Sequence, residues 1–261
     1  MTRIIFFDID GTLVSFNTHT IPQSTLDAIK VVRSKGIKVW IATGRPMPFI
    51  NNLGDLEYDG IISATGAHCQ TKEGEVIFSK PVDKADIQGM IEHQHKTGMA
   101  VAYAGNKQAI MTAPNGITEN AKEIFQLLDI PLPELHTPEE ALDFDVMEVI
   151  AFFTADEAPY MMNNVLKGCS DARWHPEFVD CVTKGSNKAT AIDKVIAYYG
   201  YDISETMAFG DGGNDIPMLQ HAAIGVAMGN ASDEVKQAAD VVTSSVDEDG
   251  IARVFSDFLM K

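Results

Sequence analysis

The chain has 261 residues, 45% of them hydrophobic and 22% charged, and its 37 acidic residues outnumber its 20 basic ones, for a net charge of -17. This composition is typical of a globular protein long enough to bury a large core, which excludes fibrous and disordered chains. No cluster of lysines and arginines stands out that could neutralise a run of phosphates. We therefore expect neither nucleic acid nor a membrane surface as a partner.

The cysteines and the first residues of the chain indicate the cellular compartment of the protein. Cys69, Cys169 and Cys181 are odd in number and widely spaced, so they suit neither a disulfide framework nor a zinc site, and we expect free thiols. The opening apolar run, residues 4–7, is far shorter than the ~20 residues of a membrane helix or the core of a signal peptide. We expect a cytoplasmic protein; the oligomeric state stays open, and a monomer is compatible with the sequence.

Strands and helices alternate at both ends of the chain. The apolar run 4–7, followed by Asp and Gly, predicts a strand buried on both faces of a parallel sheet. The same alternation returns after residue 186, so we predict one Rossmann-like α/β core of parallel strands covered by helices. The predicted helices are 22–35, 187–199 and 214–221, the predicted strands are 4–7, 38–42, 60–63, 206–209 and 224–228, and short elements follow over 235–239 and 241–243.

The middle of the chain has a different pattern. Two strands, 99–103 and 108–112, are joined by a short Gly-Asn-Lys turn, which favours antiparallel pairing and an inserted α+β domain. This insert carries 17 acidic and 6 basic residues, so most of the negative charge lies there. We predict a core of residues 1–82 and 184–261 and an insert of residues 83–183, with helices over 83–96 and 118–128 and a further strand over 146–154.

Two carboxylate-bearing loops follow predicted buried strands. Asp8 and Asp10 come directly after the first strand, and Asp211 and Asp215 come after the strand 206–209. Parallel strands bring such loops to one edge of the sheet, where open α/β folds bind their ligands. Carboxylate and backbone oxygens suit Mg²⁺, and the segment from Asp211 lacks the alternating ligands and the final Glu of an EF-hand calcium loop. The sequence therefore predicts a magnesium site.

Two further signals are weak when taken alone. Thr43 and Gly44 follow the second strand, where a glycine lets backbone amides approach an anion and the hydroxyl of Thr43 donates a hydrogen bond. Lys188 begins a predicted helix, and an isolated lysine there is most often a solvated surface group. Together with the carboxylates, these residues indicate an anion-binding site.

All four segments occur in the order found in the haloacid dehalogenase superfamily of phosphotransferases, which the chain resembles over its whole length. The insert resembles the α/β cap of the Cof-type branch, type IIB, whose members are mostly bacterial phosphatases of sugar phosphates, and the hexose phosphatases of that branch are the most similar. The four segments are Asp8-Ile9-Asp10-Gly11-Thr12-Leu13, Thr43-Gly44-Arg45, Lys188 and Gly210-Asp211-Gly212-Gly213-Asn214-Asp215.

The resemblance implies a mechanism. Asp8 would attack phosphorus and form an aspartyl phosphate, and Asp10 would act as general acid and then as general base. Magnesium would be held by the carboxylates of Asp8 and Asp211 and the backbone carbonyl of Asp10, with Asp215 as a supporting group. The phosphoryl group would be bound by Thr43, Gly44, Lys188 and Asn214.

We therefore expect a Mg²⁺-dependent phosphatase acting on hexose phosphates. The insert is expected to contact the leaving group and so to determine substrate specificity. Alternatives are a phosphomutase that returns the phosphoryl group to another hydroxyl of the same sugar, and a phosphatase for another small metabolite such as pyridoxal phosphate. A binding protein without activity is disfavoured, because Asp8 and Asp10 are both present. Three departures from the branch pattern bear on substrate preference: Thr65 for Asn, Ala189 for Gly and Asp180 for Glu.

Overall fold

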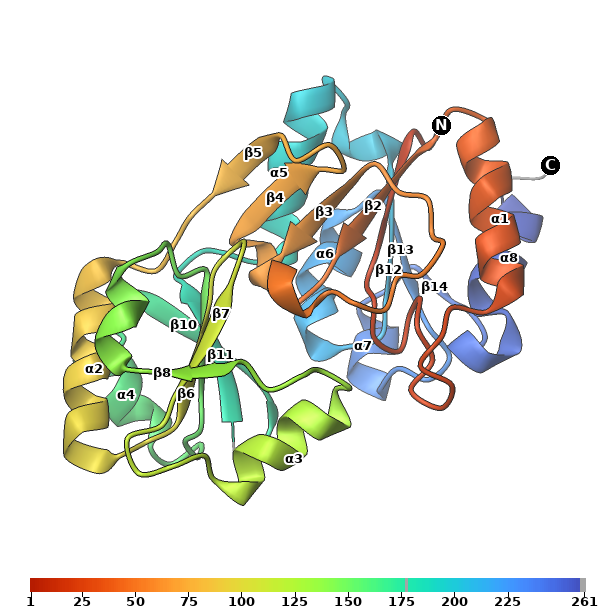
Figure 1. The fold of residues 1–261 in the computed structure, drawn as a ribbon. Coiled ribbons are helices and arrows are strands. Elements are labelled where there is room, and N and C mark those ends of the chain that lie inside the picture. Colours follow the sequence, from red (N-terminus) through yellow and green to blue (C-terminus); the bar gives the residue numbers. More distant parts are fainter. Residues whose placement is uncertain (177, 259–261) are drawn as a thin grey trace. The chain divides into compact units, whose positions relative to one another are not determined.

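The computed structural model describes residues 1–176 and 178–258, which form two compact units, each with a β-sheet of its own (Figure 1). The first unit comprises Met1–Gly44, Asn51–Ser79 and the residues from Asn187 onward. The second unit comprises Lys80–Ser186 together with the short segment Arg45–Ile50. The assignment of the second unit as a cap stays a prediction.

The first unit contains an eight-stranded sheet in the order β14-β13-β12-β1-β2-β3-β4-β5. The strands from β14 to β3 are parallel, which confirms the predicted α/β core, whereas β4 and β5 are antiparallel additions at one edge that the sequence analysis did not predict. The strands are β1 (Ile4–Phe7), β2 (Lys38–Ala42), β3 (Gly60–Ser63), β4 (His68–Thr71), β5 (Val76–Ser79), β12 (Thr206–Gly210), β13 (Ile224–Ala227) and β14 (Val241–Val242).

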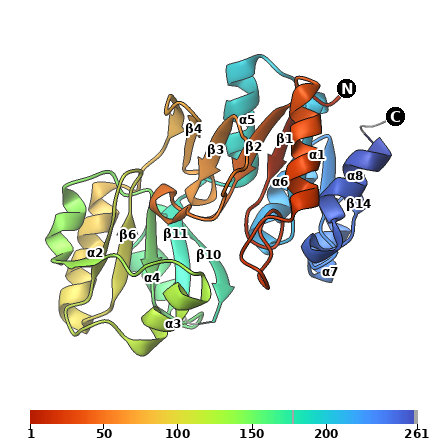
Figure 2. The same cartoon turned by 45° about the vertical axis from the view of Figure 1, so that its right-hand side comes forward.

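Helices cover both faces of this sheet. Figure 2 shows α1 and α8 side by side on one face, where the ring of Phe255 meets Phe7 edge-on with 6.1 Å between centroids. Helices α5 and α6 pack on the other face against Phe6 and Trp40. In the described residues no helix has both the length and the apolar character needed to cross a membrane. The helices are α1 (Gln23–Ser34), α5 (Lys188–Tyr199), α6 (Ile216–His221), α7 (Asp233–Gln237) and α8 (Gly250–Phe258).

The strand order reverses between β1 and β12. From β1 the chain moves outward to β2 and β3, and from β12 it moves in the opposite direction to β13 and β14. Because β1 and β12 are parallel with Phe7 paired to Phe209, Asp8 and Asp211 leave the sheet at the same edge, within a residue or two of that pair. The connections diverge at such a point, which leaves a crevice where open α/β sheets bind ligands.

The second unit contains a six-stranded sheet in the order β10-β11-β9-β6-β7-β8, antiparallel except between β7 and β8. Helices α2 and α4 pack on one face and α3 packs on the other, which confirms the predicted α+β character of this segment. The elements are α2 (Lys84–Thr97), β6 (Val101–Ala104), β7 (Ala109–Thr112), α3 (Glu119–Leu127), β8 (Glu134–His136), β9 (Glu148–Ala151), α4 (Ala158–Asn164), β10 (Cys169–His175) and β11 (Phe178–Thr183).

Glu148 is a buried carboxyl group of this unit whose polar atoms are less fully paired than those of Gln94. Gln94, for comparison, accepts a hydrogen bond from the hydroxyl of Tyr103 and donates one to Thr112, each 2.7 Å long. Glu148 lies on β9 with 1% of its surface exposed, and its Oε2 atom has no hydrogen-bond partner among the described residues. Burial raises the pKa of Glu148 well above its ordinary value, and the charge of Asp180 raises it further.

Replacing Glu148 by Gln is expected to raise the free energy of unfolding near pH 8 by ~1 kcal/mol or more, since one unit of pKa difference corresponds to about 1.4 kcal/mol. Below the ordinary pKa of 4.5, Glu148 is neutral in both the folded and the unfolded chain, so its ionisation does not lower the free energy of unfolding. As the pH rises, the unfolded chain ionises this group first, so the wild type loses stability relative to the variant. Urea unfolding of the wild type and of Glu148→Gln at about pH 5 and about pH 8 measures the difference in their free energies of unfolding. A difference that does not grow with pH would contradict the prediction.

Candidate active site

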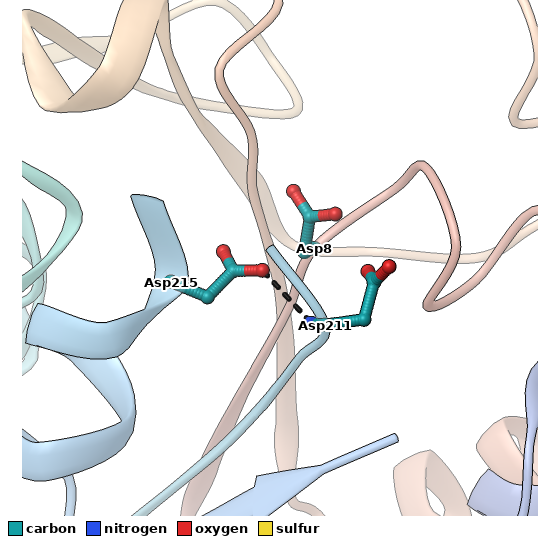
Figure 3. A group of neighbouring side chains, drawn as sticks. All are labelled: Asp8, Asp211 and Asp215. Atoms are coloured by element: carbon teal, nitrogen blue, oxygen red, sulfur yellow. Dashed lines mark hydrogen bonds between the residues drawn. The ribbon is translucent and has the colours of Figure 1, made fainter. Parts of the chain in front are cut away.

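Three carboxylates lie together beyond the carboxyl ends of β1 and β12. Asp8 follows β1, while Asp211 and Asp215 belong to the loop after β12 and its short 3₁₀ turn, Gly213–Asp215. One oxygen from each residue lies within 4.8 Å of the other two, as Figure 3 shows for the three side chains. Asp8 and Asp215 are buried and Asp211 is half-buried. The structure thus brings together two of the three predicted metal ligands and the predicted supporting group.

Lys188 reaches this cluster from the first turn of α5. The helix begins there because the side chain of Asn187 caps it, accepting a hydrogen bond of 2.9 Å from the amide of Thr190. The ammonium of Lys188 is fully buried and donates hydrogen bonds to Oδ1 of Asp8 at 2.6 Å and to Oδ1 of Asp215 at 2.5 Å. Lys188 is therefore a buried cation, whereas an isolated lysine at the start of a helix is most often solvated.

Burial and like charge set the protonation of the cluster. Burial raises the pKa of Asp8 well above its ordinary value, the charge of Asp215 raises it further, and Lys188 opposes both. The pKa of Asp211 is raised to about 7, first by burial and then by Asp215. For Lys188, burial lowers the pKa, but the charges of Asp215 and Asp8 outweigh burial, so the pKa lies above its ordinary value and the lysine stays protonated.

The charges of the cluster fit a divalent cation. Three carboxylates face one ammonium, and Lys188 is the cation whose charge lowers the pKa values of both Asp8 and Asp211. A cation held by these oxygens would offset the remaining negative charge and keep the carboxylates ionised at neutral pH. Carboxylate oxygens are also the donors that Mg²⁺ prefers. The residues present therefore fit the metal that the sequence predicts.

Asp215 has both oxygens occupied by hydrogen bonds. Its Oδ1 atom accepts the bond from Lys188, and its Oδ2 atom accepts bonds of 2.9 Å from the backbone amides of Asp211 and Gly212. A carboxylate with this set of donors is held in one orientation and has little capacity left for a further ligand. The geometry favours a role for Asp215 in orienting Lys188 and the loop.

Asp211 is held by residues distant in sequence. Its Oδ1 atom accepts a hydrogen bond of 2.8 Å from the hydroxyl of Thr12, and its Oδ2 atom accepts one of 3.2 Å from the side-chain amide of Asn230. Asn230 also donates to the carbonyl oxygen of Gly11 at 2.8 Å, so it joins the two carboxylate loops. The sequence analysis missed Asn230, because nothing near it in the chain marks its amide as part of the site.

Replacing Gly11 by Ala is expected to lower kcat/KM by at least about 100-fold, because a displacement of about 1 Å at a reacting group has this effect. Gly11 has a φ of +84°, and a methyl group there would lie 2.1 Å from Oδ2 of Asp211. Gly74 is the matched control, since its φ is +90° but a methyl group would meet nothing within 4 Å. Gly74→Ala should cost about 1–2 kcal/mol of stability and leave the rate intact. Equal losses of rate in the two variants would contradict the steric argument.

The predicted phosphate-binding residues lie together in the first unit. Thr43 and Gly44 follow β2. A methyl group on Gly44 would lie 3.1 Å from the side-chain amide nitrogen of Asn214 and 3.6 Å from the hydroxyl oxygen of Thr65. The amide of Thr65 donates to the carbonyl oxygen of Thr43 at 3.2 Å. The chain is left-handed at Ala64 and at Thr65, with φ of 47° and 49°, a conformation that side chains of this kind rarely adopt.

Gly66 completes this strained turn and explains how the turn meets α5. Its φ is +91°, and a methyl group on it would lie 2.2 Å from the carbonyl oxygen of Asn187, the residue before Lys188. The turn thus fixes the start of α5 and the position of Thr65 together.

Asp10 lies beside the carboxylate cluster, and its charge raises the pKa values of Asp8 and Asp211. Its Oδ1 atom accepts a hydrogen bond of 3.4 Å from the side-chain amide of Asn52, and its backbone forms an isolated bridge with Val14. The group of carboxylates close enough to share an ion includes Asp215 and not the side chain of Asp10. This is compatible with the predicted use of the Asp10 backbone carbonyl for the metal and of its carboxyl group for proton transfer.

Comparison with known proteins identifies the family. The haloacid dehalogenase-like hydrolase model matches residues 5–255 of the chain. The chain belongs to this family. The solved HAD subclass IIB sugar phosphatase BT4131 is 42% identical to this haloacid dehalogenase-like hydrolase, with a TM-score of 0.88 over 98% of this chain and 99% of that one. The phosphatase BT1666 from Bacteroides thetaiotaomicron is 37% identical, with a TM-score of 0.89 over 99% and 95% of the two chains.

Sequence relatives agree with this placement. YkrA of Bacillus subtilis (strain 168), a presumed phosphatase, is 33% identical over 255 residues, which cover 96% of this chain and 95% of YkrA. This haloacid dehalogenase-like hydrolase is therefore a phosphatase, an enzyme that hydrolyses phosphoric monoesters.

Proposed function

We propose that the enzyme is a Mg²⁺-dependent phosphatase of hexose phosphates that works through an aspartyl phosphate on Asp8. The observation that carries this proposal is the buried Asp8 carboxylate at the carboxyl end of β1. Its Oδ1 atom accepts a hydrogen bond from Lys188, and Asp211 lies beside it. An oxygen fixed by a hydrogen bond orients the carboxylate and leaves Oδ2 as the atom that attacks phosphorus.

Two proton transfers complete the reaction. When the Oδ2–P bond forms and the bond from phosphorus to the sugar oxygen breaks, Asp10 donates its proton to the leaving oxygen, which departs as a hydroxyl group. Asp10 then takes a proton from a water molecule as the oxygen of that water attacks the same phosphorus. The aspartyl P–O bond breaks, and inorganic phosphate and the Asp8 carboxylate are released.

The other residues bind and neutralise the phosphoryl group. Lys188 supplies a positive charge next to Asp8, and Thr43, Gly44 and Asn214 offer hydrogen bonds from two loops of the first unit. Asp8, Asp211 and the Asp10 carbonyl would hold Mg²⁺. When bound, that cation reduces the repulsion between the Asp8 carboxylate and an anionic phosphate.

Two observations support hexose phosphates as the substrate class. The relative BT4131, 42% identical, is named a sugar phosphatase. The segment 83–183, which contains most of the second unit, carries 17 acidic and 6 basic residues, which disfavours polyanions such as bisphosphates and suits the hydroxyl groups of a sugar. Selection of the leaving group by the second unit is part of this proposal.

Release of inorganic phosphate from hexose phosphates, nucleotides, pyridoxal phosphate and a sugar bisphosphate tests the proposal, with MgCl₂ and with EDTA. We expect the highest kcat/KM for a hexose monophosphate and at least a 100-fold loss on chelation, since the metal provides several kcal/mol of charge stabilisation. A bisphosphate as the best substrate would overturn the substrate class. Release that needs a bisphosphate activator, or transfer to another hydroxyl of the same sugar, would indicate a mutase.

A further inference from the structure

The side chain of Asn230 connects the loop after β13 to three other segments of the first unit. Its Nδ2 atom donates hydrogen bonds to the carbonyl oxygen of Gly11 at 2.8 Å and to Oδ2 of Asp211 at 3.2 Å. Its Oδ1 atom accepts a hydrogen bond of 3.1 Å from the amide of Val246, in the segment after β14. Two acceptors face the two hydrogens of the amide group and a donor faces its oxygen, so these partners fix its orientation.

The backbone beside Asn230 is also held in place. The amide of Gly229 donates a hydrogen bond of 3.0 Å to the carbonyl oxygen of Ser244. A methyl group on Gly229 would lie 2.6 Å from the amide nitrogen of Ser245, which means that the two loops are in close backbone contact there. Asn230 itself is exposed, so its position is set by these contacts and not by burial in the core.

Both peptide groups that flank Gly11 are fixed by hydrogen bonds. The amide of Gly11 donates one of 2.8 Å to the carbonyl oxygen of Val14, and its carbonyl oxygen accepts the one from Asn230. The peptide bond between Asp10 and Gly11 is trans and planar, so the carbonyl of Asp10 points away from the amide of Gly11 and has a set direction. Asn230 therefore holds the peptide unit next to the predicted carbonyl ligand.

The carboxylate of Asp211 receives one of these hydrogen bonds on each oxygen. Thr12, which is fully buried, donates to Oδ1 at 2.8 Å, and Asn230 donates to Oδ2. A carboxylate can accept about four hydrogen bonds, so these two orient it and leave capacity on both oxygens for a cation. Asp215, by contrast, accepts bonds from Lys188 and from two backbone amides. Of the two carboxylates, Asp211 is therefore the one that is both oriented and able to take a further ligand.

We propose that Asn230 is a positioning residue for the divalent cation, an inference that rests on the proposed Mg²⁺-dependent reaction. Asn230 joins the Asp211 carboxylate to the loop that carries the Asp10 carbonyl, so both sides of the site keep one arrangement before the cation binds. Without this link, ordering the two loops would offset part of the free energy of Mg²⁺ binding. Hydrogen-bond partners of metal ligands typically contribute about 10–100-fold in metal affinity or activity.

Titration calorimetry with MgCl₂ alone, in the absence of substrate, tests the inference. Asn230→Ala should raise the Kd for Mg²⁺ about 10-fold, at the lower end of that range, because Asn230 is exposed and water can replace part of its hydrogen bonds. In phosphate-release assays, the MgCl₂ concentration that gives half the maximal rate should rise by the same factor. The kcat at saturating MgCl₂ should fall by less than about threefold, since Asp211 regains its position once the cation is bound.

Asn17 provides the matched control. Asn17 is exposed, and its Nδ2 atom donates a hydrogen bond of 2.7 Å to Oδ2 of Asp247. It therefore also links the loop after β1 to the segment after β14, but through Asp247 and not through Asp211. Asn17→Ala should change the Kd for Mg²⁺ by less than about twofold, because the hydrogen bond that it removes does not involve Asp211 or Gly11.

Three outcomes separate the inference from the proposed function. A Kd for Mg²⁺ that changes by less than about threefold in Asn230→Ala, or that rises equally in Asn17→Ala, would overturn the inference and leave the phosphatase proposal intact. A wild type that binds Mg²⁺ but releases no phosphate would overturn the proposed reaction, and the Kd values would still decide the inference. A wild type that binds no Mg²⁺ would overturn the proposed metal dependence and the inference together.

Discussion

Asp8→Asn is expected to lower kcat by at least about 10⁴-fold for every substrate, because an amide oxygen cannot replace the attacking carboxylate. Uncatalysed hydrolysis of phosphate monoesters is so slow that the remaining residues cannot supply a measurable rate by binding alone. The variant should fold normally. Phosphate release and covalent labelling of the enzyme by phosphate, measured after rapid acid quenching, both test this result.

The stability of Asp8→Asn separates chemistry from folding. Burial and the charge of Asp215 raise the pKa of Asp8, so above its ordinary value the folded state loses stability by holding this group. In metal-free buffer at neutral pH the variant should be at least as stable as the wild type, although it loses the ion pair with Lys188. The exposed Asp55 is the control, and Asp55→Asn should change neither the rate nor the stability. Undiminished turnover by Asp8→Asn would mean that another residue is the nucleophile.

The same reasoning shows that the proposed function of Asp8 costs stability. Asp8 is a buried carboxyl group whose pKa burial raises above its ordinary value. A core selected for stability alone would carry apolar side chains at such positions. Buried polar groups that disfavour the fold are therefore a physical guide to the residues that act on a ligand.

The parallel core could be predicted because its strands are short apolar runs buried on both faces. β1, β2 and β12 are each followed at once by the loop that carries the chemistry, which makes both the strand and the site visible in the sequence. The hairpin of β4 and β5 was missed because β5 is exposed at both ends and only half-buried between them, so it shows no buried pattern. β8 was missed because a three-residue edge strand has almost no period to detect.

The predicted site residues share a place at the carboxyl edge of a parallel sheet, and that place follows from topology. What could not be predicted depends on contacts between distant segments. Asn230 joins the two carboxylate loops across more than two hundred residues of chain, and the left-handed turn at Thr65 leads into Gly66, which lies against the backbone of Asn187. Glu148 lies in an apolar run where a single glutamate reads as a solvent-facing residue, and only the folded sheet shows that it is buried.

Lys188→Met is expected to lower the free energy of unfolding by about 3–5 kcal/mol, because it leaves Asp8 and Asp215 buried without their partner. It should also lower the catalytic rate. Lys188 is fully buried, and its two hydrogen bonds to these carboxylates hold them against their mutual repulsion. Without the ammonium, the carboxylates must take up protons or be neutralised by a cation, so added MgCl₂ should stabilise the variant more than it stabilises the wild type. Thermal unfolding with MgCl₂ and with EDTA measures both effects.

The kinetic loss in Lys188→Met should be about 10²–10³-fold in kcat, as for the removal of one group that stabilises charge in the transition state. Lys194 provides the matched control, since it lies on the same helix, α5, but is exposed, with its ammonium 5.6 Å from the ring centroid of Phe78. Lys194→Met should change kcat and the free energy of unfolding no more than an ordinary surface substitution does. If Lys188→Met were as stable as Lys194→Met and MgCl₂ stabilised the two equally, the three carboxylates would not form the charged cluster on which the proposed mechanism depends.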